Sequence, residues 1–217
     1  MFGTLLISSF LSAVSNQSAT AFSARDDARQ GFSRSGDDAL DQAFIAELKR
    51  IVSVLNINPG FQYIDEMNSY STIEVYIPGT KGTVFFGVPL IKMLMMEPDG
   101  GIAVAGIAAH ECAHVLQYVI DIPSKLRTTS GSVTLLELHA DFLAGYYIGR
   151  RNGDGSSSII RLSSALYKFG DYDFKSPAHH GTPAKRSAAA EKGYAVAQNG
   201  GKLQDAIEAG MKYVKEL

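Results

Sequence analysis

The chain of 217 residues, 46% of them hydrophobic and 19% charged, has the composition of a globular protein and the length of one domain. Its net charge of −2 gives no electrostatic basis for binding nucleic acid or an anionic membrane, so we expect no nucleic-acid partner. The single cysteine, Cys112, excludes a framework of internal disulfides.

The chain begins with an uncharged apolar run, Phe2 to Val14, which is followed by the small residues Ala19-Thr20-Ala21. This pattern is typical of a secretory signal peptide, although no lysine or arginine precedes the run. The run is shorter than the roughly 20 apolar residues that a membrane span needs. We expect a signal peptide at 1–21, a flexible polar linker at 22–36 and the functional domain at 37–217. The expected location is therefore secreted or periplasmic, or cytoplasmic if the segment is not a signal peptide.

The next segments predict one helix, a few strands and a second, short helix. Asp37 or Asp38 can cap a helix that runs to about Leu55, with apolar residues at helical spacing. Alternating β-branched and aromatic residues then predict three strands, at Phe61–Ile64, Ser71–Ile77 and Thr83–Val88, with a hairpin connection at Pro78–Gly82. Pro89 fits the first turn of a short helix that ends near Met96.

Helical patterns dominate the second half of the chain. The segment Ile102–Ile120 is apolar nearly all round, which predicts a buried central helix. Further helices are expected at Thr134–Arg151 and Ser157–Phe169, and after the N-cap pair Thr182-Pro183. The predicted fold class is α+β, mostly helical, with a small sheet on the N-terminal side.

Two histidines and a glutamate lie close together in the central helix, in the sequence His110-Glu111-Cys112-Ala113-His114. Because a helix has about 3.6 residues per turn, imidazoles four residues apart project from nearly the same face and can share one tetrahedral metal ion. Glu111 lies about 100° around the helix, off the metal but beside a water bound to it. The pattern predicts a Zn²⁺ site with Glu111 as general base, whereas Cys112 faces away as a small core residue.

The next helix offers a third ligand in Glu137-Leu138-His139-Ala140-Asp141. Glu137 and Asp141 share one face of an otherwise apolar helix, so we expect Glu137 to bind the metal and Asp141 to accept the ring N–H of a ligand histidine. His139 is the competing ligand. It faces away from both acids, so His139 and Glu137 are not expected to bind together.

The remaining histidines, His179 and His180, precede the last predicted group of helices. Either of them is placed to stabilise the oxyanion of a tetrahedral intermediate. Arg186 lies one turn into the following helix and is expected either to bind substrate or to pair with Asp141 or another acid of the site.

These motifs resemble those of the gluzincin superfamily of zinc peptidases, in which a Glu-x-x-x-Asp helix follows the His-Glu-x-x-His helix. The segment Glu137–Gly145 is similar to the matching segment of the CAAX-prenyl-protease and heat-shock membrane protease type, and of bacterial neutral zinc metallopeptidases. The segment His180–Arg186 resembles the C-terminal His…Arg element of these families. The resemblance covers about Phe61 to Tyr194. It implies a zincin-like fold and an extended substrate along an edge strand that contains Asn68.

The predicted function is that of a zinc-dependent metalloendopeptidase that acts on protein or peptide substrates. Zn²⁺ held by His110, His114 and Glu137 would activate a water, and Glu111 would take its proton. No membrane span is expected in the mature chain, in contrast to the membrane members of the resembling families. The alternative is a non-catalytic zinc-binding or scaffold protein, in which a fourth protein ligand would close the coordination sphere.

Overall fold

The computed structural model describes residues 31–98, 100–126, 133–151, 155–170 and 180–217. The expected signal peptide and the first part of the expected linker lie outside these residues. The last part of that linker is held in the fold, because Phe32 and Tyr63 exchange two backbone hydrogen bonds of 2.9 and 2.8 Å. Asp37 caps the first described helix as predicted, and its side chain accepts from the backbone of Ala39 and Leu40.

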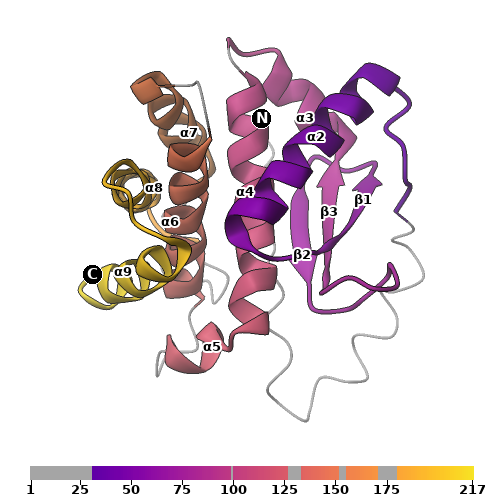
Figure 1. The fold of residues 1–217 in the computed structure, drawn as a ribbon. Helices are drawn as coiled ribbons and strands as arrows, with labels where there is room; N and C mark the ends of the chain where they lie inside the picture. The colour runs from indigo at the N-terminus through magenta and orange to yellow at the C-terminus, as the bar shows by residue number, and fades with distance from the viewer. Residues whose placement is uncertain (1–30, 99, 127–132, 152–154, 171–179) are drawn as a thin grey trace.

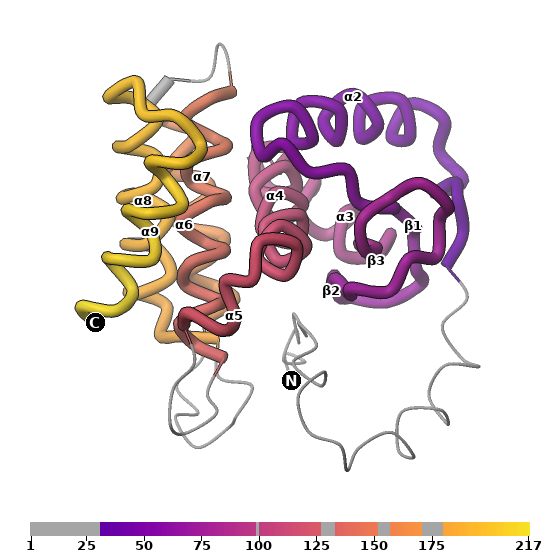
Figure 2. The backbone as a smooth tube through the Cα atoms, turned by 60° about the horizontal axis from the view of Figure 1, so that its bottom comes forward, coloured from indigo at the N-terminus to yellow at the C-terminus, as the bar shows by residue number. Residues whose placement is uncertain are grey.

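Helix α4 (Gly100–Val119) is the central element, and the other elements lie on either side of it (Figure 1). A small sheet lies on one side with α2 (Asp38–Leu55) and α3 (Val88–Met95). A group of helices covers the other side (Figure 2): α6 (Thr134–Arg150), α7 (Gly155–Phe169), α8 (Pro183–Gln198) and α9 (Leu203–Lys215). The short helix α5 (Ile122–Lys125) follows α4. The fold is α+β and mostly helical, which confirms the predicted class at this level.

The sheet has three strands in the order β1 (Gly60–Ile64), β3 (Thr83–Gly87), β2 (Ser69–Thr72). The central strand β3 pairs in parallel with β1 and antiparallel with β2. Strand β2 is therefore an edge strand, and it lies against α4. The small sheet thus brings an edge next to the helix that carries the His-Glu-x-x-His motif.

The predicted strand Ser71–Ile77 is wrong in its extent, because β2 ends at Thr72. The hydroxyl of Thr83 donates to Glu74 O at 2.8 Å and accepts from Tyr76 N at 3.1 Å. A side chain therefore binds the backbone atoms that a longer strand would use for pairing. The alternating residues beyond β2 belong to the connection to β3, and Val75 is 53% exposed.

Helix α4 is buried along most of its length, as its all-round apolar sequence predicts. This helix is also long and apolar enough to cross a membrane, by length and composition only, but 83% of its most apolar segment is buried inside the protein. No other helix among the described residues meets these criteria.

Two glycines allow α6 and α8 to cross in close contact. A Cβ atom at Gly145 would lie 1.9 Å from Ala190 O, and one at Gly193 would lie 1.8 Å from Phe142 O. Only glycine permits such an approach of two backbones. The crossing brings α8, with Arg186, over the part of α6 that carries the predicted acids.

Candidate metal centre

His110 and His114 of α4 meet Glu137 of α6 in the interior, where all three side chains are at most 2% exposed. The Nε2 atoms of the two histidines are 3.0 Å apart. Glu137 Oε2 lies 3.4 Å from His110 Nε2, and Glu137 Oε1 lies 3.5 Å from His114 Nε2. The three side chains form a buried group that could hold a metal ion, with ligand atoms within 4.8 Å of one another.

These separations fit a common metal ion. Bonds of about 2.0–2.1 Å to nitrogen and oxygen in a tetrahedral site correspond to ligand–ligand separations of about 3.3–3.4 Å. The observed distances of 3.0, 3.4 and 3.5 Å lie around that value. Two imidazoles and one carboxylate are also a donor set found in catalytic zinc sites.

Asp141 orients His110, the first candidate ligand. Arg186 donates to both carboxylate oxygens of Asp141 through Nε and Nη2, each at 2.8 Å, and His110 Nδ1 lies 2.8 Å from Asp141 Oδ1. Burial opposes the charge of Asp141, but Arg186 and His110 outweigh it and lower the pKa of Asp141 below its usual value. An ionised carboxylate only accepts, so His110 Nδ1 carries a proton, and Nε2 is the ring nitrogen that faces Glu137.

Gln117 orients His114, the second candidate ligand. Gln117 Nε2 donates to Leu136 O at 2.8 Å, which fixes the orientation of the amide because a backbone carbonyl only accepts. Gln117 Oε1 therefore faces His114 Nδ1, at 2.9 Å, and must accept from it. The Nε2 lone pair of His114 is left for the metal site.

Both histidines thus direct Nε2, the ring nitrogen that can bind a metal ion, at the same point, with 3.0 Å between the two atoms. Two lone pairs so close repel unless a cation lies between them, and either a metal ion or a proton can supply the charge. Without metal, burial disfavours a charged ring, but Asp141 and Glu137 outweigh it and raise the pKa of His110 to about 10. The site is therefore built around a positive charge.

Glu111 lies beside this group with one oxygen held and the other open. Ser69 of β2 donates to Glu111 Oε1 at 3.1 Å. Glu111 Oε2 is buried and has no hydrogen-bond partner among the described residues. Burial raises the pKa of Glu111 above its usual value, although His110 and His114 act in the opposite direction. A carboxylate with a raised pKa and an open oxygen suits a general base.

Glu137 is ionised and lies near His180. Burial would raise the pKa of Glu137, but the neighbouring His114 and His110, with a further contribution from His180, hold it well below its usual range. His180 is 6% exposed, so it belongs to the buried surroundings of the site. The other predicted loop histidine, His179, lies outside the described residues.

The remaining residues that the sequence singled out do not belong to the group of three side chains. Arg186 is fully buried and pairs with Asp141, which is the second of its two expected roles; the geometry does not offer it to a substrate. His139 is not part of the buried group that could hold a metal ion, because its ring nitrogens face Gln117 and Ile207 O. Asn68 precedes β2 and accepts from Gly87 N through its carbonyl at 2.8 Å. Cys112 is a buried core residue, as predicted.

Sequence reasoning assigned no role to Ser69 or Gln117. Gln117 had a signal, since it lies one turn beyond His114 on a buried helix where an unsatisfied amide is costly. Ser69 had none, because its contact with Glu111 depends on how the sheet edge packs against α4 and spans 42 positions of the chain.

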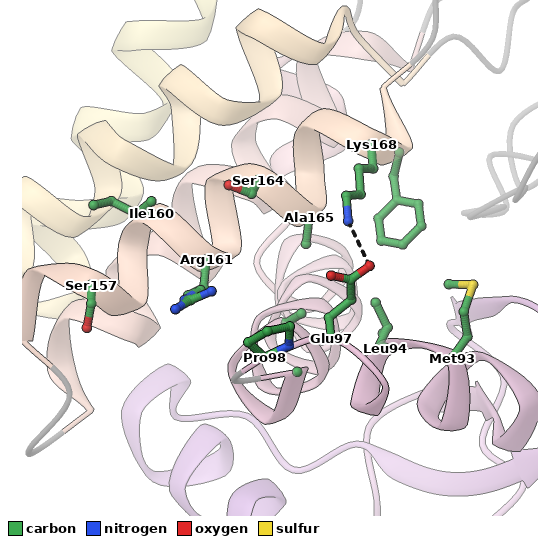
Figure 3. A pocket seen from close by; sticks show the side chains of 13 residues that line it. Met93, Leu94, Glu97, Pro98, Ser157, Ile160, Arg161, Ser164, Ala165 and Lys168 are labelled. Atoms are coloured by element: carbon green, nitrogen blue, oxygen red, sulfur yellow. Dashed lines mark hydrogen bonds and ion pairs between the residues drawn. The ribbon is translucent and has the colours of Figure 1, made fainter.

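A separate cavity of about 590 Å³ lies between α7 and the junction of α3 with α4 (Figure 3). Its wall includes Leu94, Ala103 and Ala165, and Lys168 Nζ pairs with Glu97 Oε1 at 3.2 Å. None of the metal-site residues lines it. The cavity is therefore distinct from the candidate metal centre.

Comparisons of the chain with protein-family models, with curated proteins and with solved structures return no match.

Proposed function

We propose that the protein is a zinc-dependent metalloendopeptidase with a zincin-like metal helix. The observation that carries the proposal is the convergence of His110 Nε2, His114 Nε2 and the Glu137 carboxylate in one buried place, with Glu111 beside them. This arrangement combines a ligand set of the catalytic kind with a carboxylate that has an open oxygen.

The residues around the site have separate roles in peptide hydrolysis. Zn²⁺ bound by the three ligands would polarise a carbonyl and lower the pKa of a water. Glu111 accepts a proton at Oε2 and returns it to the leaving amine, while Ser69 holds Oε1 in place. Asp141 and Gln117 keep both histidines in the tautomer that ligation requires. His180, near Glu137, is the candidate donor to the oxyanion.

The sheet edge suggests how a peptide would bind. Among the described residues, β2 pairs only with β3, so we place an extended substrate chain along its outer edge. Ser69, in this strand, touches the proposed general base. A peptide added along β2 would therefore lie beside Glu111, and Asn68 lies at the start of that edge. This geometry favours a protein or peptide substrate.

The alternative is a structural zinc site in a protein without activity. Such a site is closed by four protein ligands, whereas the group found within the described part of the chain has three. The open oxygen of Glu111 also has no purpose in a purely structural site. Both observations favour catalysis.

The substitution Glu111→Gln tests the proposal. We expect one zinc per chain in both proteins, whereas cleavage of casein should fall by roughly 10²–10⁴-fold in the variant. Glu66→Gln, an exposed carboxylate in the loop before β2, is the matched control and should cleave normally. Equal cleavage by Glu111→Gln and the unmodified chain would refute the mechanism. Bound zinc without cleavage of any member of a broad peptide library would instead support the structural alternative.

A further inference from the structure

We propose that Gln117, held in place by His139, positions His114 for metal binding, so that helix α9 is connected to the metal site by a buried chain of hydrogen bonds. This inference rests on the proposed metal site and deepens it. It assigns positioning roles to two residues that do not bind the metal themselves.

The direction of every hydrogen bond in the chain is determined at its two ends. Ile207 O in α9 lies 3.2 Å from His139 Nε2, and a carbonyl only accepts, so Nε2 carries the proton. His139 Nδ1 in the neutral ring is then an acceptor, and it lies 3.0 Å from Gln117 Nε2. The same Nε2 donates to Leu136 O at 2.8 Å.

Both N–H groups of the Gln117 amide therefore donate to atoms that can only accept, Leu136 O and His139 Nδ1. Its Oε1 is left to accept from His114 Nδ1, at 2.9 Å. Each member of the chain has its partners, and no other assignment of the protons satisfies both backbone carbonyls. The lone pair of His114 Nε2 is consequently directed at His110 and Glu137.

This chain of hydrogen bonds lies in the protein interior, where a polar group without a partner is costly. Gln117, His114 and His139 are at most 2% exposed, so water cannot replace a lost partner. A free imidazole ring could turn about its Cβ–Cγ bond, and the contact at Nδ1 opposes this rotation. Hydrogen bonds of this kind orient a ligand ring and fix its tautomer.

Helix α9 is fitted to His139. A Cβ atom at Gly210 would lie 2.9 Å from His139 Cδ2 and 3.2 Å from His139 Nε2. The absence of a side chain at Gly210 therefore lets the helix approach closely enough for Ile207 O to accept from the ring. The packing of α9 on α6 thus fixes the position of a ring that lies two hydrogen bonds away from a metal ligand.

The test is the zinc affinity of the full chain, measured by competition with a chromophoric chelator after the metal has been removed. Gln117→Met fills the same space without hydrogen bonds and should weaken zinc binding by roughly 10–100-fold. Gln117→Glu keeps an acceptor for His114 Nδ1 but loses the N–H groups that donate to Leu136 O and His139 Nδ1, so it should recover only part of the affinity. Cys112→Ala, buried in the same helix but facing away, should leave the affinity unchanged.

His139 provides the second arm of the experiment. His139→Leu removes the acceptor for Gln117, whereas His139→Asn retains an oxygen close to the position of Nδ1. We expect His139→Leu to weaken binding and His139→Asn to recover part of the loss. If Gln117→Met does not fold, as judged by circular dichroism, this pair decides the question.

The outcomes separate the two proposals. If the unmodified chain does not bind zinc, the proposed function fails. If it binds zinc and Gln117→Met stays within threefold of it, the positioning role is wrong. Bound Co²⁺ gives an independent reading, because a displaced His114 should change its visible absorption bands, whereas a purely structural loss of stability should not.

Discussion

Arg186 of α8 forms a two-point ion pair with Asp141 of α6, and on the other side of that carboxylate lies the ring of His110. Three helices therefore meet at one buried charge. Arg186 also donates to Phe169 O at 3.2 Å, so it ties the end of α7 to the same point. The arginine thus supports both the fold and the candidate metal site.

Replacing Arg186 should lower the free energy of unfolding. Arg186→Met keeps much of the side-chain volume but leaves the carboxylate of Asp141 buried without its cationic partner. Loss of one partner of a buried ion pair costs about 3–5 kcal/mol, which we expect as a decrease in the free energy of urea unfolding. Lys185→Met, exposed at the neighbouring position, is the control and should change it by less than about 0.5 kcal/mol. A similar, small effect of both substitutions would show that the pair does not contribute.

Metal binding should release a proton and strengthen as pH rises. The pKa of His110 is raised to about 10 by Asp141 and Glu137, which outweigh the effect of burial, so at pH 7 the ring of the metal-free protein is charged, with a proton on Nε2 as well as on Nδ1. The metal must displace that proton, so zinc affinity should increase about tenfold per pH unit between roughly pH 7 and 9. Calorimetry in buffers of different ionisation enthalpy measures the release directly.

The stability of the metal-free protein should follow pH in the opposite direction. A pKa that is raised in the folded state stabilises that state fully below the unfolded value of 6.5, and this contribution is lost as pH rises towards about 10. His110→Asn, which lacks the titrating group, should show neither the proton release nor tight zinc binding. Affinity that is constant from pH 6.5 to 8.5 would contradict the assignment.

Local sequence patterns were enough to predict the side chains of the candidate metal centre, but they did not predict the long-range packing around it. The positions of His110 and His114 follow from helical spacing alone, and Glu137 and Asp141 follow from the same argument on the next helix. Nothing local indicates which elements meet. The contact between Ser69 and Glu111 depends on the packing of a sheet edge on α4, and it was not predicted.

Local sequence pattern also fails to predict where strand β2 ends. The alternation after Ser71 predicts a strand to Ile77, yet β2 ends at Thr72 because the hydroxyl of Thr83 binds the backbone of the following residues. A hydrogen bond between positions nine residues apart thus overrides the local preference for extended pairing. High β-propensity predicts a strand only where a neighbouring strand is available to pair with it.

The last prediction concerns the role of Ser69 in holding the proposed general base. Ser69→Ala removes the hydrogen bond to Glu111 Oε1, so the carboxylate becomes free to turn away from the scissile bond. We expect unchanged zinc content and a loss of peptidase activity of up to about 100-fold, because small displacements of a catalytic group are costly.

The pH profile of kcat/KM should move as well in Ser69→Ala. The bond favours the charged carboxylate and lowers its pKa, so its loss should raise the pKa of Glu111 and shift the acid limb to higher pH. Ser71→Ala provides the control, since Ser71 Oγ is buried in the same strand without a hydrogen-bond partner among the described residues. Equal activity and equal acid limbs for both variants would show that Ser69 only fills space.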